Sequence, residues 1–238
     1  MNIKIATLSD IGGRSNNDDT VCARQKSDCA WIFVGDGLGG YAGGQMASQA
    51  AAEALMAATH KGSLLTDDRL MEAAGQANEA VRKVQAAKGG KMKTTLVFLS
   101  IEDGRARWMH VGDSRLYHFR GGHLQTQTMD HSVSQMAVLM GEITPHEIRF
   151  HEDRNRVLRA LGGDNARPEL SHTVMLTGGE DVFLLCTDGF WEYVYEEEME
   201  TMLRRAASPE QWLKEMEALL RTRTPNDNDN FTAAAVFC

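Results

Sequence analysis

Aspartate residues follow three short apolar segments of a kind that is typical of β-strands. Asp36 ends the run that begins at Trp31, Asp113 ends the run that begins at Trp108, and Asp188 ends the run that begins at Phe183. A fourth acidic cluster, residues 226–230, comes directly before the last apolar segment. Any single Asp-Gly step is most simply a β-turn. The recurrence of aspartate at the ends of apolar segments indicates that these residues serve one common function.

Carboxylates at the ends of neighbouring strands can meet at one edge of a sheet system, where they repel one another unless cations neutralise them. Cysteine and histidine do not stand at ligand spacing in this chain, so the available ligands are oxygen atoms. Oxygen ligands suit Mn²⁺ or Mg²⁺ better than zinc or copper. The pattern therefore predicts a site for hard divalent ions.

One arginine near the N-terminus, Arg14, precedes the adjacent carboxylates Asp18 and Asp19 by four and five residues. A solvated arginine in a polar loop is the ordinary interpretation. A planar guanidinium is nevertheless well shaped to hold two oxygens of a phosphate group. An arginine together with clustered aspartates indicates phosphoryl chemistry.

The composition is that of a folded protein without the charge pattern of a nucleic-acid binder. The chain has 238 residues, of which 42% are hydrophobic and 24% are charged, and its formal net charge is −8. These values exclude wholesale disorder, and no basic run suggests nucleic acid as a partner. Because repeats, low-complexity tracts and proline-rich linkers are missing from the sequence, we expect a single domain over residues 1–238.

The N-terminal segment MNIKIATLSD is not typical of a secretory signal, and no window of the sequence reaches the length of a membrane span. We therefore expect a cytoplasmic protein with reduced cysteines and no membrane partner.

The expected elements are strands in the middle of the chain, flanked by helices. Two turn sequences, residues 102–105 and 120–123, join apolar segments and predict an antiparallel meander. The expected strands are 31–34, 94–101, 106–111, 115–119, 182–186 and 231–237. The expected helices are 43–59, 67–87, 134–140, 196–207 and 209–222.

Taken in order, these motifs resemble those of the metal-dependent type 2C protein serine/threonine phosphatases, in their bacterial branch. The resemblance covers nearly the whole chain. It starts at Arg14-Ser-Asn-Asn-Asp18-Asp19 and Asp36-Gly37-Leu38-Gly39-Gly40 and ends at Cys186-Thr187-Asp188-Gly189 and Asp229-Asn230-Phe231-Thr232. Between them lie Gly112-Asp113-Ser114-Arg115, Asp130-His131-Ser132 and the segment 141–162.

The resemblance implies an α+β fold, a four-layer α/β/β/α sandwich in which two packed antiparallel sheets are flanked by helices. It implies two Mn²⁺ or Mg²⁺ ions that share a bridging water, with a third ion at a weaker position. Arg14, Asp36 and Asp188 would be the catalytic residues, with Arg14 holding the substrate phosphate. The metal ligands would be Asp18, Asp19, Asp36, Gly37 through its carbonyl, Asp113, Asp188, Glu192 and Asp229, with Asp113 and Glu192 at the third position.

The activity implied by the resemblance is hydrolysis of phosphoserine and phosphothreonine in proteins by attack of a metal-activated water. The implied partners are phosphorylated proteins, with a serine/threonine kinase and its targets as the obvious candidates, and a monomer is expected. This sequence departs from the family pattern at Asp18, Glu192, Lys93 and Leu38. Leu38 leaves the acid that protonates the leaving group unassigned. The stretch 132–154 resembles the family's mobile flap beside the active site.

Two other functions are compatible with parts of the sequence. Residues 35–40 fit the G-x-G-x-x-G fingerprint of dinucleotide-binding proteins, although Asp36 would place a negative charge where a pyrophosphate should approach. A non-catalytic member of the phosphatase fold that only binds phosphoproteins is the second alternative. Among the histidines, which stand singly, His131 beside Asp130 is the one worth testing.

Overall fold

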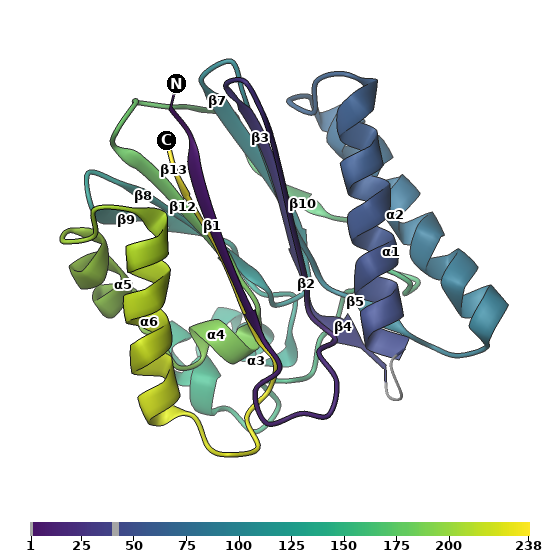
Figure 1. The fold of residues 1–238 in the computed structure, drawn as a ribbon. Helices are drawn as coiled ribbons and strands as arrows, with labels where there is room; N and C mark the ends of the chain where they lie inside the picture. Colours follow the sequence, from purple (N-terminus) through teal and green to yellow (C-terminus); the bar gives the residue numbers. More distant parts are fainter. Residues whose placement is uncertain (1, 40–42) are drawn as a thin grey trace.

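The computed structural model describes residues 2–39 and 43–238 and places most of the strands in two antiparallel sheets (Figure 1). The five-stranded sheet has the order β1 (Lys4–Asp10), β13 (Phe231–Phe237), β12 (Asp181–Cys186), β8 (Arg115–Arg120), β9 (His123–Gln127). The six-stranded sheet contains β10 (Glu169–Leu170), β7 (Arg105–Val111), β6 (Leu96–Glu102), β3 (Cys29–Gly35) and β2 (Thr20–Lys26), and β11 (Val174–Met175) also pairs with β7. The short strands β4 (Gly37–Leu38) and β5 (Lys93–Thr94) pair with each other.

Helices cover the outer face of each sheet, as Figure 1 shows. The six-stranded sheet carries α1 (Gly43–Ala58) and α2 (Asp67–Lys88), and the five-stranded sheet carries α5 (Glu196–Leu203) and α6 (Pro209–Arg223). The remaining helical segments are η1 (Thr59–Lys61), α3 (Val133–Leu139), η2 (Pro145–Phe150) and α4 (Asp188–Trp191). The α/β/β/α sandwich expected from the resemblance is confirmed. None of the described helices combines the length and the apolar character that a membrane crossing requires.

Local sequence explains where the two long outer helices begin. The Thr66 side chain accepts a hydrogen bond from the Arg69 N–H at the start of α2, and Ser208 does the same for Gln211 at the start of α6. Pro209 follows Ser208 at the first helical position, where a missing N–H costs nothing. Each helix then turns an apolar stripe toward its sheet, and burial of that stripe stabilises it.

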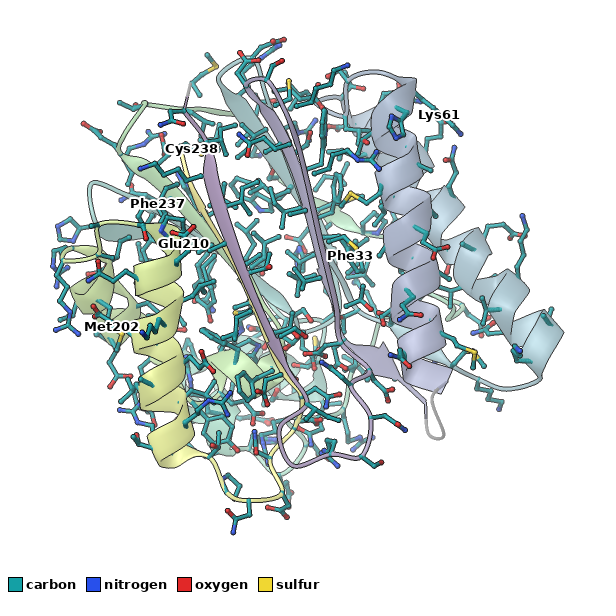
Figure 2. The ribbon with its side chains drawn as sticks, in the orientation of Figure 1. Phe33, Lys61, Met202, Glu210, Phe237 and Cys238 are labelled. Atoms are coloured by element: carbon teal, nitrogen blue, oxygen red, sulfur yellow. The ribbon has the colours of Figure 1, made fainter. Side chains whose placement is uncertain are left out.

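Three apolar cores fill the spaces between the four layers (Figure 2). Side chains alternate along each strand, so one strand serves two cores. In β3, Phe33 packs on the α1 and α2 side, whereas Ile32 and Val34 pack between the sheets. Strands buried on both faces read as continuous apolar runs, and this is why β3, β6, β12 and β13 are recognisable in the sequence.

The predicted meander is wrong in one respect. The turns at 102–105 and 120–123 do form hairpins, β6–β7 and β8–β9, but these hairpins belong to different sheets. The chain leaves one sheet after Val111 and enters the other at Arg115, so Asp113 lies at the crossing. Both hairpins have buried faces, and neither apolar pattern records which sheet a strand joins. The strand expected over 94–101 is also divided, because β5 ends at Thr94 and β6 starts at Leu96.

Candidate active site

One end of the sandwich gathers the predicted acidic residues. Strand β3 ends one residue before Asp36, β7 ends two residues before Asp113, and β13 begins two residues after Asp229. A cleft of about 400 Å³ opens there. Of the nine predicted site residues, the cleft is lined by seven: Arg14, Asp18, Asp36, Gly37, Asp113, Asp188 and Asp229. The remaining two, Asp19 and Glu192, do not line the cleft.

Asp36 sits at the centre of the acidic cluster. Its backbone N–H donates to Thr95 Oγ1 over 2.8 Å, and Thr95 Oγ1 is in turn 2.7 Å from Ser114 Oγ, next to Asp113. Burial raises the pKa of Asp36 well above its ordinary value, and the charges of Asp188, then of Asp19 and further aspartates, raise it further. The fold therefore holds several carboxylates close enough to oppose one another's ionisation.

Asp19 lies behind the cleft and supports it through Thr187. The Thr187 hydroxyl donates to Asp19 Oδ2 over 2.8 Å and accepts from the Thr232 backbone N–H over 3.0 Å. Burial raises the pKa of Asp19 to about 7, and Asp188 adds to this effect, although hydrogen bonds from the two threonines oppose it. Thr187 therefore connects Asp19 to the strand end that precedes Asp188.

Asp113 provides the observation that tests whether the cleft fits a cation. Its side chain is buried, and Oδ1 has no hydrogen-bond partner among the described residues. Burial raises the pKa of Asp113 well above its ordinary value, and the charge of Asp188 reinforces the shift. A buried carboxylate oxygen without a donor is costly unless a cation or water satisfies it. The residues present therefore fit a hard divalent ion.

Glu192 borders an adjoining cavity of about 300 Å³ that Asp188 and Asp229 also line. Arg154 Nε donates to Glu192 Oε1 over 3.0 Å. Burial and the charge of Asp188 raise the pKa of Glu192 to about 7, and Arg154 acts in the opposite direction. Glu192 thus lies within the same electrostatic cluster but is held by a residue at the end of the 132–154 stretch.

Arg14 and Asp229, which were predicted to have separate roles, are paired with each other. Arg14 Nε donates to Asp229 Oδ1 over 3.1 Å, and its Nη2 donates to Oδ2 over 3.0 Å. The two side chains are 52% and 47% exposed, so water screens the pair and little free energy holds it together. Arg14 can therefore turn toward an anion in the cleft at small cost.

Asn230 is a site residue that the sequence reasoning did not single out. Its Oδ1 accepts from the Asp18 N–H over 2.8 Å, and its Nδ2 donates to the carbonyls of Ile11 and Asn16. This amide therefore holds the N-terminal loop, with Arg14 and Asp18, against the start of β13. Its position directly after Asp229 and before the last apolar segment was the available signal.

Arg115 is a second site residue for which the sequence predicted no role, although it belongs to the motif Gly112-Asp113-Ser114-Arg115. Its guanidinium makes two bonds of 2.8 Å to Asp130 and lies 3.4 Å from the centre of the Trp191 ring. The Trp191 indole N–H donates to the backbone carbonyl of Asp113 over 2.9 Å. This buried group connects the crossing loop to α4, and thereby sets Asp113 relative to Asp188.

The backbone at Gly37 approaches the backbone at Gly44 more closely than a residue with a Cβ atom would allow. A Cβ on Gly37 would lie 2.2 Å from the carbonyl oxygen of Gly44 and 2.6 Å from that of Asp18, and both atoms belong to the backbone. Backbone atoms cannot move aside without a large energetic cost, so only glycine fits here. The close contact packs β4 and the start of α1 against the loop that contains Asp18.

Replacing Gly37 with Ala is therefore expected to lower the free energy of unfolding by about 3 kcal/mol, because the backbone must separate. Urea unfolding in the presence of chelator measures this effect without any metal. Gly75→Ala in α2 is the matched control, since nothing lies within 4 Å of its added Cβ, and it should stabilise slightly. Equal stabilities for Gly37→Ala and wild type would contradict the packing argument.

A second cluster, away from the aspartates, contains His110, His131 and Glu169, whose ligand atoms lie within 4.8 Å of one another. The two imidazole rings are stacked, 4.7 Å apart and only 9° from parallel. Lone pairs in nearly parallel planes do not converge on one ion. His131 Nδ1 instead accepts from the Gly112 N–H over 3.2 Å. His131 thus supports the backbone beside Asp113 rather than serving as a metal ligand in this geometry.

The dinucleotide fingerprint is not supported by the structure. The described part of residues 35–40 does connect a strand to a helix, whereas Gly40 lies outside the described residues. Strand β3, however, pairs antiparallel with both β2 and β6, and Asp36 points into the acidic cluster. A dinucleotide fold requires a parallel sheet.

The family model of protein phosphatase 2C matches residues 9–229. The chain belongs to this family. It is 34% identical to the serine/threonine protein phosphatase PstP of Mycobacterium tuberculosis, covering 87% of this chain and 40% of that protein. It is 31% identical to protein phosphatase PhpP of Streptococcus pneumoniae, covering 79% and 78%. The chain therefore spans less than half the length of the mycobacterial relative.

A solved structure shows the same fold with manganese. The catalytic domain of PstP in complex with two manganese ions superposes with a TM-score of 0.83 at 32% identity, covering 99% of this chain and 97% of that one. The bacterial phosphatase family expected from the sequence is thus confirmed.

Proposed function

We propose that this chain is a metal-dependent protein serine/threonine phosphatase that hydrolyses phosphoserine and phosphothreonine. The observation that carries the proposal is the unsatisfied, buried Oδ1 of Asp113 among carboxylates whose pKa values are raised by burial and by one another. Such a site is unfavourable without cations, and its oxygen ligands suit Mn²⁺ or Mg²⁺. The catalytic domain of PstP, whose structure contains manganese, has the same fold.

We assign each residue a role that its position in the cleft supports. Asp36, Asp188 and Asp229 would hold two ions, with Gly37 contributing its carbonyl. Asp18 and Asp19 would hold the site from the side of the N-terminal loop, and Asp113 with Glu192 would hold a third ion. Such ions supply, when bound, a water of lowered pKa and positive charge beside the phosphoryl oxygens.

Arg14 is the residue suited to the substrate phosphate. Arg14 donates two hydrogen bonds to the two carboxylate oxygens of Asp229, and a guanidinium binds two phosphoryl oxygens in the same way. Arg14 would be free to leave Asp229 for the substrate phosphate when Asp229 serves as a metal ligand, because the attraction between the two side chains would then be weaker. Leu38, which also lines the cleft, offers no proton, so water remains the candidate donor to the leaving group.

The direct test is hydrolysis of p-nitrophenyl phosphate and of phosphothreonine peptides with and without metal. We expect turnover with Mn²⁺ or Mg²⁺ and none after chelation, with recovery when metal is restored. Turnover that persists in chelator would overturn the metal-dependent scheme. Metal-dependent binding of a phosphopeptide without hydrolysis would instead favour the non-catalytic alternative.

The physiological substrates are proposed only by class. The relative PstP is a serine/threonine protein phosphatase and the relative PhpP is a protein phosphatase, which supports phosphorylated proteins as substrates. A serine/threonine kinase and its targets remain the candidate partners, and a monomer the expected state. Size-exclusion chromatography with light scattering measures the latter.

A further inference from the structure

A second groove lies directly beside the cleft and shares a wall with it. It has a volume of about 330 Å³. Leu38, Asn155 and Val157 line both cavities, so a chain that enters one can continue into the other. None of the predicted metal ligands lines this groove.

The groove is basic, although the protein as a whole carries a net charge of −8. Three cationic residues line it, Lys93, Arg156 and Arg159, with Asp164 as the opposing charge. The cleft next to it is lined by four aspartates besides Asp36. A positive wall adjoining an acidic centre would focus anions at one side of the site.

Lys93 is the most informative of these cations. It lies on β5, where its backbone pairs with Leu38 of β4, so it is fixed to the strand that borders the cleft. Across residues 2–39 and 43–238 it makes no salt bridge. Lys93 does not line the acidic cleft, so the proposed metal chemistry leaves its charge unused.

The two arginines are held in place but keep donors available. Arg156 pairs with Asp153 over 3.1 Å on an exposed surface, where the pair is worth little. Arg159 Nη1 lies 3.5 Å from His131 Nε2, which is too long and too poor an acceptor to satisfy a guanidinium. Both guanidinium groups can therefore donate hydrogen bonds to an anion that enters the groove.

We propose that this groove binds an anionic side chain of the substrate, either a carboxylate or a second phosphate, close in sequence to the phosphoresidue in the cleft. The inference rests on the proposed phosphatase function and adds a preference among substrates. An extended chain advances about 3.3 to 3.6 Å per residue. Because the two cavities adjoin, the anion should stand within about three residues of the target.

The first experiment compares phosphothreonine peptides on the wild-type enzyme. The peptides are identical except at one position, placed in turn one, two or three residues before or after the target. That position carries Gln, Glu or a non-hydrolysable phosphonate analogue of phosphoserine. We expect kcat/KM to rise about five- to tenfold from Gln to Glu at one of these positions, and the gain to shrink in high salt. The phosphonate shows whether phosphate is preferred to carboxylate.

The second experiment reverses the charge of the groove. Lys93→Glu should abolish or invert the preference for Glu, and Lys93→Glu combined with Arg159→Glu should invert it further. Lys91→Glu is the matched control, because this exposed lysine is two residues away and does not line the groove. The control should keep the wild-type preference. All variants should hydrolyse p-nitrophenyl phosphate at the wild-type rate, since that substrate has no flanking residue.

Failure of this inference is distinguishable from failure of the phosphatase assignment. Absence of p-nitrophenyl phosphate hydrolysis would refute the assignment itself. Normal hydrolysis with equal kcat/KM for all peptides in the wild type, or a preference for Glu that survives Lys93→Glu, would overturn the groove proposal. The wild-type comparison stands even if a charge-reversal variant does not fold.

Discussion

Asp36→Asn and Asp188→Asn are expected to reduce metal-dependent kcat/KM by more than a hundredfold. Each change removes a negative charge and an oxygen ligand from the centre of the cleft. Loss of a group that only supports a ligand costs roughly 10- to 100-fold, so loss of the ligand itself should cost more. The steady-state rate on a phosphothreonine peptide at saturating Mn²⁺ measures the effect.

The same substitutions should leave the fold intact. In chelator, Asp36→Asn is expected to match or exceed the wild type in thermal stability, because burial and the neighbouring Asp188 already disfavour its charge. Asp28→Asn, in the exposed turn at the far end of β3, is the matched control and should change neither activity nor stability. Activity near the wild-type rate in either cleft variant would contradict the assigned roles.

In the metal-free protein, the contribution of the acidic cluster to stability should fall as the pH rises from about 6.5 to 8.5. The folded pKa values of Asp19 and Glu192 are both raised to about 7, whereas carboxyl groups in unfolded chains titrate near 4. The folded state therefore binds protons more tightly. The resulting stability is fully present below the unfolded pKa and disappears as the pH rises through the folded pKa.

Histidine makes an opposing contribution across this window. Burial lowers the pKa values of His110 and His118 and lowers that of His131 to about 4, so the unfolded state binds more protons at these sites and their contribution to stability rises with pH. Because both proteins share these histidines, we expect the midpoint of thermal unfolding in chelator to fall by roughly 2 to 4 °C more across the window in the wild type than in Asp36→Asn.

Saturating Mn²⁺ should remove most of that dependence, because bound cations offset the charge of the ionised carboxylates. Asp36→Asn should make the metal-free profile flatter, whereas Asp28→Asn should not. Differential scanning calorimetry at matched ionic strength provides the measurement. A wild-type profile in chelator that falls no more steeply than that of Asp36→Asn would show that the carboxylates are not coupled as the structure places them.

The amino-acid sequence by itself determined the strands that are buried on both faces and the aspartates at their ends. Strands β3, β12 and β13 read as nearly continuous apolar runs, and acidic residues follow β3 and β12 and precede β13. Burial and chemistry are both local properties of residue type, so they can be read directly. Strands β1 and β2 were missed because their exposed or half-buried residues dilute the apolar pattern.

Only the tertiary structure decided which side chains meet. Thr187 binds Asp19 across 168 residues, and Arg14 grips Asp229 across 215. The chain's change of sheet at Asp113 and the basic groove around Lys93 likewise depend on segments brought together by packing. Contacts of this range arise when distant apolar faces are buried against each other, and no local spacing encodes them. Residue types thus set the available chemistry, and the packing of the two sheets set where it takes place.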